Sequence, residues 1–134
     1  MNFISRDTDY AVRALVYMTK VSKKKNSVIT VDEIVREEDL PERFLRRILQ
    51  RLAKNKILSS YKGNQGGFSF LKSPKNIKLT DVIKVFQGEV KLTNCLLKGS
   101  ICPELKTCAL RKKLNQIERS VGKKLRDVTI TSLV

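Results

Sequence analysis

Residues 31–71 read VDEIVREEDLPERFLRRILQRLAKNKILSSYKGNQGGFSFL and contain the most informative patterns of the chain. As far as Leu52 the apolar residues recur at three- and four-residue intervals, which predicts helices, and two short apolar runs around glycines follow. Thr30 and Glu33 have the spacing of a capping box, so a short helix is expected to begin there. Pro41 suits the first position of the next helix, because the N–H that it lacks is not needed there. The expected order is two helices and then a hairpin.

The second of these helices has an apolar side and a basic side. Its apolar stripe is Phe44, Leu45, Ile48, Leu49 and Leu52, and its other side carries Arg43, Arg46, Arg47, Gln50 and Lys54. A short helix, a tight turn and an Arg-rich helix are typical of helix-turn-helix DNA readers, since the guanidinium group matches both phosphates and guanine edges. From this segment alone, an ordinary amphipathic helix with a solvated face is an equal alternative.

A hairpin is expected directly after the Arg-rich helix. Residues 57–62 and 67–71 favour strands, and the glycines between them permit the backbone angles of a tight turn. A basic hairpin in this place is the wing of a winged helix, and its tip carries Lys62, Asn64 and Gln65. A plain two-stranded turn is the less favoured alternative. The sequence thus predicts a mainly α fold with a small β-wing, a winged helix-turn-helix.

Further helices are expected on both sides of this stretch. Ser5 can cap a first helix, and a helix capped by Thr80 should end at Gly88. A long C-terminal helix has an apolar stripe formed by Ala109, Leu110, Leu114, Ile117, Val121 and Leu125. Since little else in the chain could cover this stripe, we expect a dimerisation helix that pairs with a second copy.

The charge of the chain is strongly positive. The 134 residues carry a net charge of +15, from 28 Lys and Arg against 13 Asp and Glu. Residues 1–39 contribute nothing to this excess, and two basic blocks at 41–62 and 109–126 contribute most of it. The second block is consistent with a solvated face, whereas the first covers the predicted helix and wing and would attract phosphate backbones. We therefore expect an anionic partner, a nucleic acid.

The chain has no histidine, and this limits its chemistry. Ser-His-Asp and Cys-His catalysis and His-based zinc fingers are excluded, and no phosphate loop or carboxylate pair stands out, so an enzyme is not expected. No apolar run approaches the length of a membrane span, and the start MNFISRDTDY does not resemble a signal peptide. We expect a cytoplasmic protein without a membrane contact.

Three cysteines lie close together, Cys95, Cys102 and Cys108, in a C-x6-C-x5-C pattern. The residues between them include glycine, proline and small polar side chains, which favours a loop. Thiolates gathered in one loop select soft metals and iron–sulfur clusters. Buried structural cysteines and a thiol switch remain alternatives, because the chain offers neither a fourth cysteine nor a histidine as a further ligand.

Several segments in this order carry a family resemblance. They are SRDTDYAVRAL (5–15), the helix-turn-helix (31–58), the wing KGNQGGF (62–68), IKLTDVI (77–83), the three-cysteine loop and VTI (128–130). Over essentially its whole length the chain resembles the small winged-helix regulators typified by IscR, NsrR, RirA and CymR. The resemblance implies a homodimeric bacterial transcription factor that binds a palindromic operator in double-stranded DNA. It also implies an iron–sulfur cluster, 4Fe–4S or 2Fe–2S, that reports on iron, nitric oxide or oxidants.

Carried over to this sequence, the resemblance makes Cys95, Cys102 and Cys108 the sulfur ligands. IscR-like members take a histidine three residues after the last cysteine, and Arg111 stands there instead. NsrR-like members recruit an aspartate from the first helix of the partner subunit, and Asp9 is at the matching position. Asp9 suits equally well the role of a carboxylate at a helix N-terminus. The first cysteine spacing is one residue longer than the usual family pattern.

The resulting hypothesis is a cluster-sensing repressor with a DNA-binding domain (1–88), a cysteine loop (89–108) and a dimerisation helix with its tail (109–134). The residues expected to contact DNA are Arg43, Arg46, Arg47 and Gln50 on the helix and Lys62, Asn64 and Gln65 on the wing. One alternative is a cluster-free regulator of the same fold that responds through thiol chemistry or a protein partner. Another is a basic RNA-associated protein whose cysteines bind a structural metal.

Overall fold

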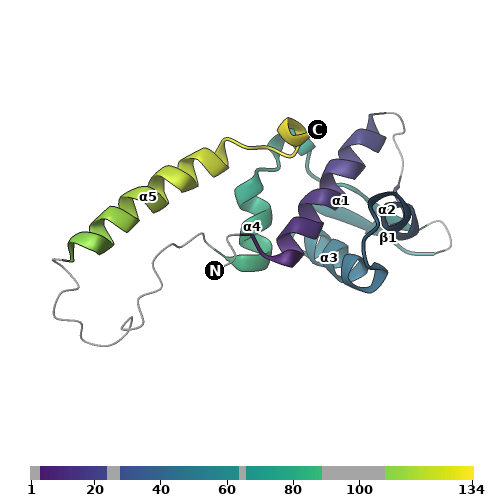
Figure 1. Cartoon of the computed structure of the whole chain (residues 1–134). Coiled ribbons are helices and arrows are strands. Elements are labelled where there is room, and N and C mark those ends of the chain that lie inside the picture. Colours follow the sequence, from purple (N-terminus) through teal and green to yellow (C-terminus); the bar gives the residue numbers. More distant parts are fainter. Residues whose placement is uncertain (1–3, 24–27, 64–65, 89–107) are drawn as a thin grey trace.

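The computed structural model describes residues 4–23, 28–63, 66–88 and 108–134. Three helices, α1 (Arg6–Ser22), α2 (Val31–Glu38) and α3 (Glu42–Lys54), precede a hairpin of β1 (Leu58–Tyr61) and β2 (Gly67–Phe70), as Figure 1 shows. The 3-10 turn η1 (Pro74–Asn76), the helices α4 (Leu79–Gln87) and α5 (Ala109–Arg126) and the short η2 (Thr131–Leu133) follow. The chain is a winged helix, mainly α with a small two-stranded sheet, which confirms the predicted fold class.

Side-chain caps begin the first two helices, as the sequence predicted. Ser5 Oγ accepts a hydrogen bond from the Thr8 N–H at 3.2 Å, and Thr30 Oγ1 accepts one from the Glu33 N–H at 3.2 Å. Each bond satisfies a backbone donor that has no partner within the first turn of its helix. Between α2 and α3 the chain turns at Asp39, whose φ of 50° lies in the left-handed region that aspartate tolerates better than most residues.

The start of α4 differs from the prediction. Thr80 was expected to cap this helix, but α4 begins at Leu79, so the prediction is wrong. The reason is a carboxylate, because Asp81 Oδ2 accepts a hydrogen bond from the Lys78 N–H at 3.0 Å and stabilises the turn before Thr80. The end of α4 at Gly88 is as predicted.

The hairpin is antiparallel, and Tyr61 lies opposite Gly67 in its register. The segment before α2 extends it, because Ile29 and Phe68 exchange two backbone hydrogen bonds of 2.9 Å each. Glycine is required at position 67, where a Cβ atom would overlap the carbonyl oxygen of Ile29. The wing is therefore fixed to the segment that begins the helix-turn-helix.

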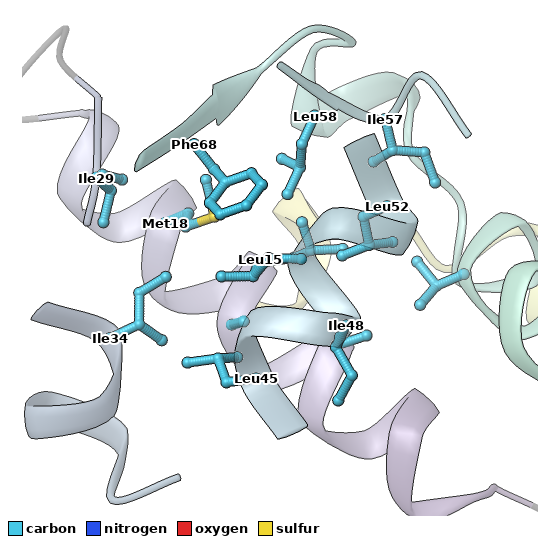
Figure 2. Packing of buried hydrophobic residues seen from close by; sticks show 14 of the residues in the cluster. Leu15, Met18, Ile29, Ile34, Leu45, Ile48, Leu52, Ile57, Leu58 and Phe68 are labelled. Carbon is cyan, nitrogen blue, oxygen red and sulfur yellow. The ribbon is translucent and has the colours of Figure 1, made fainter. Parts of the chain in front are cut away.

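One hydrophobic core joins α1, α2, α3, α4 and the hairpin (Figure 2). Its fully buried side chains include Leu15, Met18, Ile34, Leu45, Ile48, Leu52, Leu58 and Ile77. Four of the five stripe residues predicted on α3 are buried in this core. The exception is Phe44, which is 38% exposed.

The chain returns to this core after α5. Ile130 is fully buried, and its N–H donates a 3.0 Å hydrogen bond to the Ile77 carbonyl. Two residues further along, the Leu79 N–H donates a 2.9 Å bond to the Val128 carbonyl, so Lys78 and Thr129 form an antiparallel bridge. Figure 1 shows α5 extending away from the other helices while the C-terminus lies against them. The tail thus anchors one end of α5. The division of the chain into a DNA-binding domain (1–88), a cysteine loop (89–108) and a dimerisation helix with its tail (109–134) stays a prediction.

Candidate nucleic-acid interface and sensing residues

The buried stripe of α3 turns its basic side outward. All four residues expected to contact DNA from this helix are exposed: Arg43, Arg46, Arg47 and Gln50. Aliphatic burial sets this orientation, since each buried leucine or isoleucine contributes about 1.5–3 kcal/mol relative to exposure. The contacts of these four side chains with DNA stay a prediction.

A hollow of about 450 Å³ lies between α3 and the wing. Arg46 and Gln50 line it from the helix, Lys62 lines it from the wing, and the start of α2 also contributes. Three of the residues expected to bind DNA thus face one space. The other two wing residues, Asn64 and Gln65, lie outside the described residues.

Arg46 already has an acidic partner on its own helix. Its Nη2 lies 2.9 Å from Glu42 Oε1, one turn earlier, and both side chains are more than half exposed. Such exposed pairs contribute only about 0.3–0.5 kcal/mol, so a guanine edge or a phosphate can replace the carboxylate. The pairing of Glu42 with Arg46 was not predicted from the sequence, although their four-residue spacing is a recognisable signal.

The opposite edge of α3 carries two further arginines with partners outside the wing. Arg47 Nη2 lies 3.9 Å from Asp7 Oδ1 on α1, and its guanidinium carbon is 5.3 Å from the centre of the Phe44 ring. Arg51 has its guanidinium carbon 5.4 Å from the centre of the Phe86 ring on α4. Phe44 was predicted to lie on the apolar stripe of this helix, and Arg51 was counted in the basic block without being predicted to contact DNA. The three-residue spacing of Phe44 and Arg47 could have indicated their contact, whereas nothing local links Arg51 to Phe86.

Tyr17 joins α1 to α2. Its hydroxyl donates a 3.1 Å hydrogen bond to Glu33 Oε1. Burial, together with the bond to Glu33 and its negative charge, raises the pKa of Tyr17 to about 12. The hydroxyl therefore stays protonated at neutral pH and holds the first two helices together.

Only one of the three cysteines lies among the described residues. Cys108 is a free, half-buried thiol immediately before α5, and its carbonyl accepts a 3.2 Å hydrogen bond from the Lys112 N–H. Cys95 and Cys102 lie outside the described residues. Within the described ranges, no three His, Cys, Asp or Glu side chains gather into a group that could hold a metal ion. The cysteine site therefore remains a prediction from the sequence.

Asp9 has a local partner in the first turn of α1. Its Oδ2 lies 3.1 Å from Arg13 Nε, one turn later, and the carboxylate is about half exposed. This position complements the positive end of the helix dipole, which agrees with the structural alternative for Asp9. The half-exposed carboxylate is also accessible from solvent.

The apolar side of α5 is largely uncovered by the other residues that the structure describes. None of its residues is buried, and Leu110 and Ile117 are 68% and 50% exposed. Among the described helices, none is both long enough and apolar enough to cross a membrane. Exposed apolar side chains in a regular row are a feature of helices that pair with another chain.

Comparison with known proteins agrees with this architecture. The family model Rrf2, described as an iron-dependent transcriptional regulator, matches residues 4–134. A protein of Aquifex aeolicus whose name places it among the HTH-type transcriptional regulators is 29% identical over 127 residues. The match covers 93% of this chain and 86% of that protein.

Two solved structures have the same fold. CymR, the global cysteine regulator of B. subtilis, matches with a TM-score of 0.81 at 22% identity, over 99% of this chain and 96% of CymR. IscR of T. potens matches with a TM-score of 0.75 at 20% identity, over 97% of this chain and 84% of IscR. At such identities the likeness shows a shared fold and says nothing further about ligands.

Proposed function

Because this chain belongs to the Rrf2 family of transcriptional regulators, we propose that it is a homodimeric repressor that senses iron, nitric oxide or redox state through an iron–sulfur cluster. As the sequence predicted, the protein is a regulator and not an enzyme. A transcriptional regulator acts where the chromosome is, so we assign it to the bacterial cytoplasm. The RNA-associated alternative is set aside, because the family match concerns regulators of transcription.

The observation that carries the proposal is the hollow shared by α3 and the wing. Arg46, Gln50 and Lys62 line this space from two elements that the core holds in place. With α3 in the major groove, Arg46 suits a guanine edge and Gln50 suits an adenine edge. Lys62 would then lie on the adjacent backbone as a phosphate contact. This arrangement supports readout of one operator half-site by each copy of the chain.

The exposed apolar side of α5 supports the homodimer. Leu110 and Ile117 would be covered by the same apolar side of α5 in a second copy, because a two-fold interface uses one surface twice. A palindromic operator requires the same symmetry in the protein, with the two α3 helices about one turn of DNA apart. The anchored tail at Ile130 would link the α5 interface to the DNA-binding core.

The sensing part of the proposal depends on donor chemistry. Cys95, Cys102 and Cys108 offer three thiolates, and Asp9 of a second copy offers a carboxylate, a set that fits an iron–sulfur cluster. When bound, such a cluster supplies iron that reacts with nitric oxide and oxidants. As a ligand, Cys108 would fix the start of α5, and Asp9 would exchange its 3.1 Å contact with Arg13 for the cluster.

The first experiment compares the protein with and without its cluster. The protein is purified anaerobically, and a duplex is selected from a random pool with it. Affinity for this duplex is then measured before and after removal of iron with a chelator. We expect brown protein with visible absorption and a changed affinity after iron removal. Equal affinities would contradict sensing, and a colourless anaerobic protein would contradict the cluster.

A second experiment tests the carboxylate ligand with a matched control. Asp9→Ala should shift the visible absorption spectrum and shorten the lifetime of the cluster in air. Asp7→Ala removes a carboxylate from the same helical turn, which pairs with Arg47, and should leave the spectrum unchanged. If Asp9→Ala also leaves the spectrum unchanged, Asp9 is only a helix-stabilising residue.

A cluster-free, thiol-responsive regulator is the second candidate. One observation favours it: Asp9 is already paired with Arg13 on its own helix. In that case the anaerobic protein is colourless, and oxidation of the cysteines with diamide changes its affinity for the selected duplex. The same oxidation should have no effect on a Cys108→Ser variant if Cys108 is the responsive thiol.

A further inference from the structure

The last turn of α4 contacts both α1 and α3. The Phe86 ring lies under Arg51 of α3, with 5.4 Å between the ring centre and the guanidinium carbon. The neighbouring Gln87 reaches α1 instead, where its Oε1 accepts a 2.8 Å hydrogen bond from Thr8 Oγ1 and a 2.9 Å bond from the Ser5 N–H. Two consecutive side chains thus connect one helix end to the two helices beside it.

Gln87 completes the start of α1. Thr8 is fully buried, and a buried hydroxyl needs a hydrogen-bond partner. Gln87 Oε1 supplies one from α4, and Ser5 Oγ also lies within 3.0 Å of the Thr8 hydroxyl. The position of the first turn of α1 therefore depends on the end of α4.

This first turn carries Asp7, the partner of Arg47. The 3.9 Å contact between Asp7 Oδ1 and Arg47 Nη2 holds Arg47 on the α1 edge of α3, away from the wing. Arg51 follows Arg47 by one helical turn on the same edge, and two like charges at this spacing repel each other. Arg47 and Arg51 thus have separate partners, a carboxylate on α1 and an aromatic ring on α4.

We propose that Phe86 and Gln87 are positioning residues for DNA binding, which hold Arg51 and Arg47 in place for contacts with backbone phosphates. The inference rests on the proposed DNA-binding function. An arginine that is held before binding loses less freedom when it meets a phosphate, so the affinity is higher. Phosphate contacts carry no sequence information, and the effect therefore falls equally on operator and random DNA.

The main experiment is a double-mutant cycle on DNA affinity. Phe86→Leu removes the ring and keeps an apolar side chain, and it is measured alone and together with Arg51→Ala. The probes are a 30-base-pair duplex selected from a random pool and an unselected duplex, titrated by fluorescence anisotropy at several KCl concentrations. We expect Phe86→Leu to weaken binding to both duplexes by about 2- to 5-fold, the range for an exposed cation–π contact. In the Arg51→Ala background the loss should disappear, and Phe86→Tyr should restore most of the affinity.

Gln87 provides an independent pair of variants, which also covers the case in which Phe86→Leu fails to fold. Gln87→Leu removes the acceptor for Thr8 and Ser5, whereas Gln87→Glu keeps an acceptor oxygen at the same place. Gln87→Leu should weaken binding by about 2-fold, a small effect because it passes through the exposed Asp7–Arg47 pair. Gln87→Glu should keep the wild-type affinity. In the Arg47→Ala background, Gln87→Leu should cause no further loss of affinity.

The outcomes distinguish a failure of the proposed positioning role from a failure of the proposed DNA-binding function. If the wild-type protein binds neither duplex, the proposed DNA-binding function fails. If the wild-type protein binds, but Phe86→Leu and Gln87→Leu lower only the melting temperature, the two residues are merely structural. The inference is also overturned if each loss of affinity persists without its arginine.

Discussion

Gly67→Ala tests the attachment of the wing to the helix-turn-helix. The new Cβ would overlap the carbonyl oxygen of Ile29 and lie 2.8 Å from the carbonyl carbon of Ile29 and 2.9 Å from Val28 Cγ1. Ordinary contacts of a Cβ begin near 3.4 Å, so the strand and the segment before α2 must separate. The backbone bonds that join Ile29 to Phe68 lie directly at this place.

The expected loss of stability can be estimated from the contacts that Gly67→Ala would break. Two backbone hydrogen bonds of 2.9 Å break, each worth about 1 kcal/mol in net stability. Phe68 is 5% exposed, and partial exposure of its ring costs about 1 kcal/mol more. We expect Gly67→Ala to lower the free energy of unfolding by about 2–4 kcal/mol. Affinity for the selected duplex should fall as well, because the wing leaves its place beside α3.

Gly122→Ala is the matched control, since it makes the same chemical change within α5. Its Cβ would have only Arg126 Nη1 nearby, at 3.8 Å, and alanine favours a helix over glycine by up to about 1 kcal/mol. Urea unfolding followed by circular dichroism measures both variants, at one protein concentration because a dimer is stabilised by mass action. The two substitutions should change stability in opposite directions. A loss below about 0.5 kcal/mol for Gly67→Ala would refute the reasoning.

Three further predictions concern the tail, the wing and Tyr17. Ile130→Ala should lower stability by about 2–5 kcal/mol in the same urea assay, and an unchanged midpoint would show that the tail does not pack in the core. Lys62→Ala should reduce the slope of log affinity against log salt concentration by about 0.9 for any duplex, whereas an unchanged slope would exclude a phosphate contact. The pKa of Tyr17 is raised from 10.0 to about 12, so its stabilising effect is complete below pH 10 and is lost as the pH rises towards 12. The stability difference between wild type and Tyr17→Phe should shrink over that pH range, and a constant difference would contradict the bond to Glu33.

Much of the fold could be predicted from the sequence, because the interactions that determine it are local. Caps such as Ser5 and Thr30 act on residues within the same turn, and the apolar period of α3 defines its buried side within one helix. The hairpin followed from glycines at the turn. The boundary error at Thr80 was also local, since Asp81 provides a competing cap for the residue before the helix.

The candidate site could be predicted from the sequence only in part. The sequence identified the exposed basic residues of α3, but it could not divide them between the wing hollow at Arg46 and the α1 edge at Arg47. That division depends on which neighbouring element lies beside each edge of the helix. Cys95 and Cys102 are known from the sequence alone, because they lie outside the described residues.

The winged helix and the basic side of α3 could be predicted from the sequence alone, because periodicity, caps and turn glycines act over a few residues. Only the tertiary structure revealed the return of Ile130 to the core and the contact between Phe86 and Arg51. It also revealed the bond between Gln87 and Thr8, which joins residues 79 positions apart. Contacts at such separations leave no local pattern in the sequence, since they depend on how complete helices pack against each other.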